Sequence, residues 1–583
     1  MKKLLTIITC ILLCMILVSC NAENTAKVPS SEGLLFETYG ADTCVLAGIG
    51  TCTDKNVTVP EYSQDGKKVI AIKAGAFKGE SNIESIVLPK SVERINENAF
   101  RDASKLVSID IGGTKVIGRS AFYGCASLKT LTLGSTLTEI DKEAFQFCTA
   151  LESLVIPDNV TQIGDYAFSG NAKLSSLSIG ESVQTIGAFA FQNCKNLKSI
   201  TIPKSVRTIG ESSFEYCSNL SSLTIENGVE TIEKRAFFTC GAITEVNLPS
   251  TVTQIGTESF RYCTGLKKVE LSKSISRMGD YAFADCTSIS ELKLNEGISV
   301  IGANAFSKCK ELTSLDIPAS VLTISRYAFN ECEKLANVTL REGLRSINGF
   351  NNCTSLTHIE IPKSVKSIGP YAFSGASALQ EVVIPEGVKR IDIFTFSNCT
   401  SLRSVTIPSS VNSIDSGAFE YCESLKSVII PEGIVFLPKD IFHGCKSLET
   451  VTLPQTLKEI DSGVFGGCTS LKEISIPAGV TSIKSGLFAG CTSLVSVTFA
   501  SDLESIPERA FLDCESLVSL DIGDNVKWIY DRAFENCKNL VTIGNTSEII
   551  SIGEYAFSGC DKLEKFDLHN KLIGYGSIPW MEW

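Results

Sequence analysis

Apolar residues recur along this chain in an order that predicts a short strand and a second short apolar segment in every repeat. In one representative repeat, Ile200 and Ile202 alternate with polar residues, which is the period of a strand with one buried face. Pro203 ends that strand, because proline cannot donate to a continuing ladder. Val206 and Ile209 then form a second short apolar segment. The pattern therefore predicts one short strand that ends at the proline, followed by a second apolar segment.

The rest of the repeat predicts a compact turn that leads back to the next strand. Gly210 follows the second apolar segment as a turn residue. Phe214, Cys217 and Leu220 lie three residues apart, a spacing that indicates a short helical turn.

A single phenylalanine marks this repeat through most of the chain. The interval is 23 residues except twice, 22 between Phe100 and Phe122 and 21 between Phe329 and Phe350. The 22 positions are 77, 100, 122, 145, 168, 191, 214, 237, 260, 283, 306, 329, 350, 373, 396, 419, 442, 465, 488, 511, 534 and 557. Such regularity is typical of a solenoid.

The fold class follows from the burial that each repeat requires. One unit cannot cover its own apolar side chains, so successive units must stack and pair their strands in parallel. Parallel crossovers are right-handed in nearly all proteins. The sequence predicts an α/β solenoid, a right-handed superhelix of about 22 units of 23 residues with short parallel strands.

The repeat pattern LxxIxIPxxVxxIGxxAFxxCxx resembles the leucine-rich repeats of the BspA-like, or Treponema-type, family. The resemblance covers residues 72–563, and the segment Ile347–Phe350 departs from it by lacking two residues before the phenylalanine. Residues 34–71 and 564–583 do not match and are interpreted as an N-terminal β cap and a C-terminal cap. A strand pair is expected at 35–39 and 44–49.

The N-terminus has the pattern of a bacterial lipoprotein signal. Lys2 and Lys3 precede an apolar run from Leu4 to Val18, too short to span a bilayer as a helix. The run ends in Leu-Val-Ser-Cys, which resembles a lipobox. The resemblance implies a signal peptide at 1–19, lipid on Cys20, a lipidated tether at 20–33, and an exported bacterial lipoprotein of the cell envelope or surface. An ordinary cleaved signal or an uncleaved anchor helix would also fit the apolar run.

Charge and residue usage exclude several functions. The net charge of −12 argues against a nucleic-acid partner, which would need a clustered basic face. The three histidines, His358, His443 and His569, are scattered, and none has a serine or cysteine partner in the sequence pattern. We therefore expect no catalytic residues, no metal site, no cofactor and no enzymatic activity.

The cysteines follow the repeat. Eighteen of the 23 lie three residues after the repeat phenylalanine, and only Glu80, Ala103, Asn171 and Ala376 interrupt this column. Because alanine and asparagine occur at the same position, we interpret the column as a reduced, buried ladder. Cys44 and Cys52 stand apart in the N-terminal cap, where they form either a disulfide or two buried thiols.

Two sets of exposed positions are candidate contact surfaces. Strand positions between the buried residues are mostly Ser and Thr, which also suit any exposed strand. Aromatic residues recur two residues before or after the repeat phenylalanine, where some would form a ridge. Phe436, Trp528 and Tyr530 replace residues that are small or polar in other repeats, so these three are the predicted partner contacts.

The family resemblance implies a binding function. BspA-like proteins imply adhesion to host matrix proteins, other bacteria or epithelial surfaces, with a protein or glycoprotein ligand and membrane contact through the lipid anchor only. The alternative is a structural scaffold or accessory subunit of a cell-envelope complex, which the flat Ser/Thr face favours. An enzyme or glycan receptor is least favoured, because no carboxylate or aromatic cluster breaks the repeat.

Overall fold

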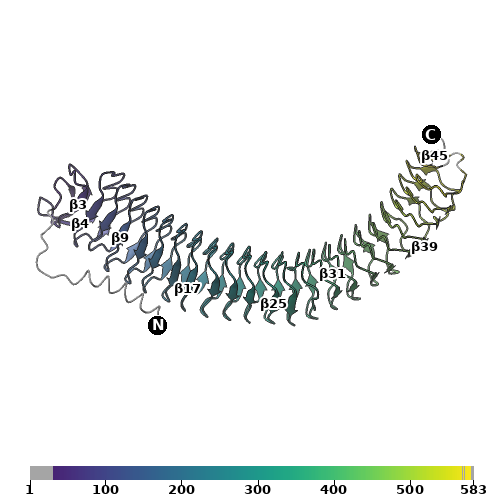
Figure 1. Cartoon of the computed structure of the whole chain (residues 1–583), viewed down its shortest axis with the longest axis horizontal. Helices are drawn as coiled ribbons and strands as arrows, with labels where there is room; N and C mark the ends of the chain where they lie inside the picture. Colours follow the sequence, from purple (N-terminus) through teal and green to yellow (C-terminus); the bar gives the residue numbers. More distant parts are fainter. Residues whose placement is uncertain (1–29, 568, 570, 580–583) are drawn as a thin grey trace.

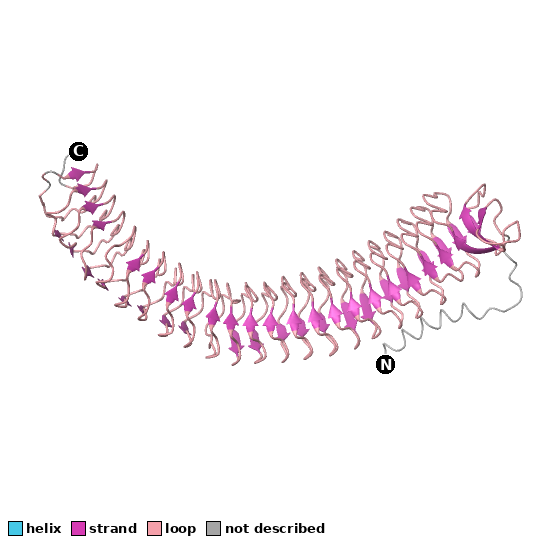
Figure 2. Ribbon diagram, turned by 180° about the vertical axis from the view of Figure 1, so that it is seen from behind, coloured by secondary structure: helices cyan, strands magenta, loops and turns pink. Residues whose placement is uncertain are grey.

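The structure is a computed structural model, and it describes residues 30–567, 569 and 571–579. The predicted signal at 1–19, Cys20 and most of the tether at 20–33 lie outside these residues. The described chain winds into stacked coils that form one continuous arc (Figure 1). The arc carries two rows of short strands (Figure 2), one at the predicted strand and one at the second apolar segment of the repeat. The solenoid prediction is therefore confirmed.

The first row, called here the long-strand row, holds strands of three or four residues. It comprises β3 (Asn56–Thr58), β5 (Ser85–Val87), β7 (Ser108–Asp110), β9 (Thr130–Thr132), β11 (Ser153–Val155), β13 (Ser176–Ser178), β15 (Ser199–Ile202), β17 (Ser222–Ile225), β19 (Glu245–Asn247), β21 (Lys268–Glu270), β23 (Glu291–Lys293), β25 (Ser314–Ile317), β27 (Asn337–Leu340), β30 (Glu381–Val383), β32 (Ser404–Thr406), β34 (Ser427–Ile429), β36 (Thr450–Thr452), β38 (Glu473–Ile476), β39 (Ser496–Phe499), β41 (Ser519–Asp521) and β43 (Thr542–Gly544).

The second row, called here the short-strand row, holds mostly two-residue strands. It comprises β1 (Leu35–Thr38), β2 (Thr43–Gly48), β4 (Lys68–Ile72), β6 (Arg94–Ile95), β8 (Val116–Ile117), β10 (Glu139–Ile140), β12 (Gln162–Ile163), β14 (Thr185–Ile186), β16 (Thr208–Ile209), β18 (Thr231–Ile232), β20 (Gln254–Ile255), β22 (Arg277–Met278), β24 (Val300–Ile301), β26 (Thr323–Ile324), β28 (Ser346–Ile347), β29 (Ser367–Ile368), β31 (Arg390–Ile391), β33 (Ser413–Ile414), β35 (Phe436–Leu437), β37 (Glu459–Ile460), β40 (Ser505–Ile506), β42 (Trp528–Ile529), β44 (Ser551–Ile552) and β45 (Leu572–Ile573).

Strand register follows the repeat length. Strands of neighbouring coils pair in parallel, so that Ile200 lies beside Leu223 and Ile209 beside Ile232. The first 18 strands of the short-strand row form one sheet, whereas the long-strand row is divided into sheets of two to four strands.

Two prolines coincide with the breaks in the short-strand row. The residue after each short strand normally donates its N–H to the preceding coil, as Asp415 does to the carbonyl oxygen of Ile391 at 2.9 Å. Pro438 and Pro507 have no N–H to donate. β35, which Pro438 follows, does not pair with β33 of the preceding coil. β40, which Pro507 follows, does not pair with β37.

The segment around each phenylalanine is a turn and not a helix, so the predicted helical turn and the α/β description are wrong. No helix is present among the described residues. The N–H of Phe214 donates to the carbonyl oxygen of Ala236 in the next coil at 2.8 Å, whereas the N–H of Glu215 donates to Ser212 at 3.1 Å. This alternation between the next coil and the same coil replaces the ladder of a helix. The right-handed sense of the superhelix stays a prediction.

Columns of identical side chains fill the core. The repeat phenylalanines are buried and stacked from Phe77 to Phe557, with ring centroids 4.9–6.0 Å apart. Beside them, all 18 column cysteines are buried free thiols. Each thiol donates to a phenylalanine carbonyl oxygen of the coil before, as Cys217 does to Phe191 at 3.3 Å. Each column cysteine is thus a small apolar residue whose S–H group has a hydrogen-bond acceptor. The prediction of a reduced, buried ladder is confirmed.

The two ends of the solenoid are closed differently. At the N-terminus β1 pairs antiparallel with β2, and β2 pairs in parallel with β4. At the C-terminus β45 adds to β44, and Phe566 contacts the last repeat phenylalanine, Phe557, edge to face.

Candidate interaction surface

The turn segments carry the aromatic residues of the candidate surface. Residues two before and two after the repeat phenylalanine repeatedly adopt a positive φ, for example Ser212 at 51° and Tyr216 at 60°. Eleven aromatic residues occupy these left-handed positions, and we call them the turn-face ridge. They are Phe147, Tyr166, Phe189, Tyr216, Tyr262, Tyr281, Tyr327, Tyr371, Phe394, Tyr421 and Tyr555.

A left-handed backbone disfavours these side chains. A residue with a Cβ pays roughly 1–2 kcal/mol to adopt this conformation, and Gly, Asn and Asp pay least. Other coils of this chain place Asn193, Asn398 and Asn536 at the equivalent position after the phenylalanine. An aromatic ring at a position that favours asparagine therefore needs a compensating role, in packing or in binding.

Part of that role is packing between coils. A Cβ added to Gly170 would lie 2.4 Å from the ring of Phe147, and one added to Gly444 would lie 2.4 Å from the ring of Tyr421. These two rings therefore lie against a glycine in the turn segment of the next coil. Tyr166 and Phe189 stack directly with ring centroids 4.6 Å apart.

A dense part of the ridge lies in the N-terminal half of the solenoid, in the repeats of Phe214, Phe237 and Phe260. The rings of Tyr216 and Tyr262 both meet Phe238 edge to face, at centroid distances of 5.8 and 5.4 Å. Arg235 lies over Phe238 at 4.0 Å, and Arg261 lies over Tyr262 at 4.8 Å. Tyr216 is 38% exposed and Tyr262 37% exposed, whereas Phe238 is buried beneath them.

Carboxylates hold the two arginines in place. Arg235 pairs with the buried carboxylate of Glu215 at 2.9 Å. Arg261 pairs with Glu258 at 2.6 Å and with Asp285 at 3.0 Å. The carboxylates therefore fix the orientation of both guanidinium groups before any partner arrives. Tyr and Arg are the residue types that dominate binding energy at protein interfaces, and fixed side chains lose less entropy on binding.

The predicted contacts Phe436, Trp528 and Tyr530 lie outside this cluster, with Trp528 and Tyr530 together in one coil and Phe436 in another. Phe436 and Trp528 are both the first residue of a short strand, in β35 and β42, so other coils separate them. Phe436 is 40% exposed and lines a pocket of about 340 Å³. Tyr530 is 49% exposed and Trp528 half-buried. They stay candidates for separate contacts.

The sequence pattern signalled the tyrosines of the ridge but not its arginines or its backbone conformation. Arg235 lies two residues before a repeat phenylalanine, and Phe238 and Arg261 each lie one residue after one, where most other coils have different residue types. The available signal was the mixture of Gly, Asn, Asp and aromatic residues two positions from each phenylalanine.

The disulfide alternative for Cys44 and Cys52 is not formed. Both are free thiols. Cys44 is buried in β2, where its Sγ donates to the carbonyl oxygen of Lys67 at 3.5 Å. Cys52 is half-buried in the turn that follows β2. The structure thus has two free thiols, of which only Cys44 is buried as the second alternative expected.

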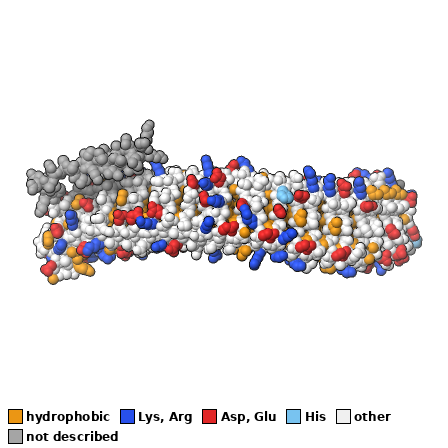
Figure 3. All heavy atoms as spheres, turned by 90° about the horizontal axis from the view of Figure 1, so that it is seen from below, with side chains coloured by type: hydrophobic (Ala, Val, Ile, Leu, Met, Phe, Trp, Pro, Cys, Tyr) orange, Lys and Arg blue, Asp and Glu red, His pale blue; other side chains and the backbone are white. Residues whose placement is uncertain are grey.

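The charged side chains of the described residues are mixed in sign and do not gather into a metal site. Lys and Arg intermingle with Asp and Glu along the outer side of the arc (Figure 3). Within residues 30–567, 569 and 571–579, no group of three or more His, Cys, Asp or Glu side chains is arranged to hold a metal ion. In the same part of the chain, no helix has the length and hydropathy needed to cross a bilayer.

A curved β-solenoid of short repeats with paired parallel strands and buried columns of identical side chains is typical of a leucine-rich repeat protein, a class suited to protein–protein interaction. The chain belongs to the family of the BspA type leucine rich repeat region, whose model matches residues 70–169, 138–267, 253–374, 346–472 and 458–577.

Several solved structures are similar to this chain. A leucine-rich repeat protein from Bacteroides ovatus is 24% identical over 86% of this chain and 99% of its own, with a TM-score of 0.27. A leucine rich cell surface protein from Faecalibacterium prausnitzii is 22% identical over 82% and 97%, with a TM-score of 0.28. The T. pallidum leucine rich repeat protein is 26% identical over 38% and 91%, with a TM-score of 0.28. No curated protein matches the sequence.

Proposed function

We propose that this chain is a non-enzymatic, lipid-anchored surface protein of a bacterium that binds a protein or glycoprotein on a host or neighbouring cell through its turn-face ridge. The observation that carries the proposal is the set of aromatic rings at left-handed backbone positions, where asparagine or glycine would cost less. The prearranged cluster of Tyr216, Arg235, Phe238, Arg261 and Tyr262 is the proposed centre of contact.

The shape of the protein supports this function. Stacked coils present the ridge along the arc, so a large partner touches several coils at once. Several anchored copies on one cell would engage together and raise the overall affinity without new contacts. The N-terminal Cys20 would hold the chain at the membrane, and stable anchoring requires more than one acyl chain.

The double substitution Tyr216→Asn/Tyr262→Asn separates binding from folding. Asparagine fits a left-handed backbone, so we expect the melting temperature to stay within a few degrees of the parent protein. The loss of two exposed rings is expected to weaken binding at least roughly tenfold. Binding of the purified chain to immobilised matrix proteins, mucins and epithelial cells measures the effect.

The control for this experiment is Trp528→Ala, which removes an aromatic ring away from the ridge. Equal loss of binding in both variants would shift the contact toward the C-terminal end. A folded chain that binds nothing in the panel would favour the scaffold function, in which the solenoid is a spacer within an envelope complex.

Lipid attachment is tested at Cys20. We expect Cys20→Ser to abolish incorporation of a radiolabelled fatty acid and to move the protein from the membrane fraction to the soluble fraction, because the acyl chains supply the membrane affinity. A variant with serine at Cys10, inside the apolar run, is the matched control and should still be labelled. Unchanged labelling of the Cys20 variant would contradict the proposal.

A further inference from the structure

The shortened repeat opens a pocket in the long-strand row. The interval from Phe329 to Phe350 lacks two residues, and in the coil that follows residues 357–361 form no strand. β27 pairs only with β25 on one side of this coil, and β30 pairs only with β32 on the other. A pocket of about 820 Å³ lies over this coil and the next two.

The floor of this pocket is apolar. Pro362, Pro385 and Pro408 come from three successive coils and are buried beneath it. Val383 is 62% exposed at a strand position where the next coil has Thr406. The volume and the apolar lining suit a small segment of a ligand.

The rim of the pocket is acidic. Four carboxylates, Glu342, Glu360, Glu381 and Glu386, face one lysine, Lys363. Glu342 accepts the N–H of Lys363 at 3.1 Å, and the Nδ1 of His358 lies 3.6 Å from a carboxylate oxygen of Glu381.

One carboxylate of the rim has no partner within the protein. The side chain of Glu360 is exposed and makes no hydrogen bond or ion pair within the part of the chain that the structure describes. The excess of negative charge over an apolar floor is therefore available to a cationic ligand.

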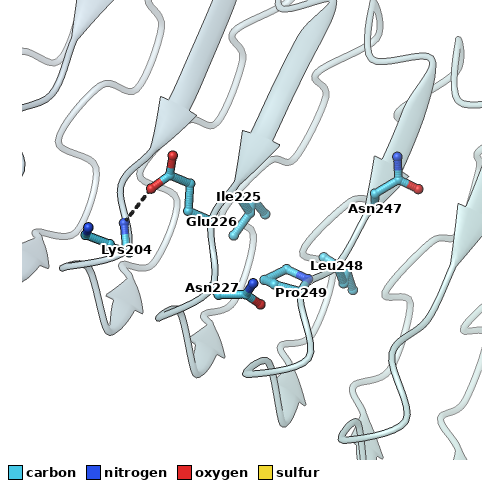
Figure 4. A pocket seen from close by; sticks show the side chains of 7 residues that line it. All are labelled: Lys204, Ile225, Glu226, Asn227, Asn247, Leu248 and Pro249. Carbon is cyan, nitrogen blue, oxygen red and sulfur yellow. Dashed lines mark hydrogen bonds between the residues drawn. The ribbon is translucent and has the colours of Figure 1, made fainter.

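A corresponding pocket on earlier coils lacks this excess. It has a volume of about 470 Å³ and lies at the same strand ends, between Ile225 and Pro249 (Figure 4). Its lining holds one carboxylate, Glu226, which accepts the backbone N–H of Lys204 at 3.1 Å, and one lysine, so the formal charges of its lining cancel. The repeat geometry thus supplies a shallow hollow, and the shortened repeat coincides with the larger, acidic one.

We propose that the pocket over residues 358–363 and 381–386 binds an extended basic peptide segment of a partner protein. An arginine or lysine of the peptide would lie between the rim carboxylates, and the neighbouring apolar side chain of the peptide would pack on Val383. Charge complementarity argues for this occupant, because four carboxylates oppose a single lysine. The guanidinium of an arginine can bind a carboxylate through two hydrogen bonds. This site is separate from the turn-face ridge and does not depend on the ridge being an interface.

The test uses the full chain and three short fluorescent peptides. The first alternates leucine with arginine, the second alternates leucine with glutamate, and the third alternates glycine with arginine. Fluorescence anisotropy at physiological ionic strength measures their binding. We expect only the leucine–arginine peptide to bind, because it alone has cationic side chains for the rim carboxylates and apolar side chains for the floor of the pocket.

Two variants locate that binding. Glu360→Gln/Glu381→Gln removes two rim charges, and Val383→Ser removes the exposed apolar side chain. Each variant should lower the affinity for the leucine–arginine peptide at least roughly tenfold. These side chains are exposed, so the melting temperature should change little.

Two matched controls complete the experiment. Glu245→Gln/Glu291→Gln removes the same charge from strand positions outside the pocket that are equivalent to Glu381, and Tyr216→Asn/Tyr262→Asn removes two exposed rings of the ridge. Both should keep the affinity of the parent protein for the peptide. The proposal is wrong if the leucine–arginine peptide does not bind, if the leucine–glutamate peptide binds equally, or if the Glu245/Glu291 control loses as much affinity as the pocket variants. Loss of host binding in the ridge variant with peptide binding retained would separate the two sites.

Discussion

Phe283→Ala is expected to lower the free energy of unfolding by about 3–5 kcal/mol, the usual cost of truncating a buried aromatic side chain. Phe283 is completely buried in the phenylalanine column. Its ring centroid lies 5.1 Å from that of Phe260 and 5.4 Å from that of Phe306. The cavity would therefore remove contacts from two neighbouring coils at once. Native-state hydrogen exchange of amides between residues 260 and 306 measures the effect.

The matched control is Ser404→Ala, at an exposed strand position of β32. Because this side chain faces solvent, its loss should change stability by no more than about 0.5 kcal/mol. A loss below about 1 kcal/mol for Phe283→Ala would contradict the role of the column as the core.

Alkaline pH is expected to unfold the solenoid because of its cysteine column. Burial raises the pKa of Cys194, Cys332, Cys399 and Cys491 to about 12. In the unfolded chain the pKa of a thiol is about 8.5. Below that pH the thiols are protonated in both states, and their contribution to stability is fully present. Above it the unfolded chain releases protons that the folded chain keeps, so stability falls as pH rises toward 12.

The size of this effect follows from the number of thiols. Each one contributes about 1.4 kcal/mol per pH unit within this window, so these four alone give a slope of roughly 5–6 kcal/mol per pH unit. Burial also raises the pKa of neighbouring thiols such as Cys217 and Cys422, which steepens the slope. Urea unfolding followed by circular dichroism from pH 8 to pH 11 measures it.

A variant with alanine at these four positions isolates the thiols from tyrosine and lysine ionisation. Alanine already occupies the column at Ala103 and Ala376, so the coil accommodates it. We expect this variant to lose stability less steeply above about pH 8.5 than the parent protein. Identical slopes in both proteins would show that the column does not control alkaline stability.

The two proposed binding surfaces arise from different departures from the repeat. The ridge uses turn positions that the fold leaves free to vary, and its residues differ from coil to coil without changing the repeat length. The acidic pocket coincides with a change of repeat length, which interrupts the pairing of β27 and β30 with the coil between them. A solenoid can therefore acquire specificity by either route while its core columns stay constant.

The sequence predicted a feature correctly where that feature depends on one residue type at a fixed position. The alternation of Ile200 and Ile202 predicted β15, and the proline after it predicted where this strand ends. The regular phenylalanine predicted the stacked core. The contacts predicted at Phe436, Trp528 and Tyr530 stay a prediction, and these residues lie in two different coils.

The sequence by itself therefore determined the repeat length, the buried columns and the parallel strands, because each depends on the spacing of side chains along one coil. The tertiary structure alone decided that the turn is not a helix, because the N–H of Phe214 finds its acceptor in Ala236, a full coil away. It also decided which exposed residues meet. Tyr216, Phe238 and Tyr262 come together, as do Glu360 and Val383, only when successive coils stack, since their contacts join residues about one repeat apart.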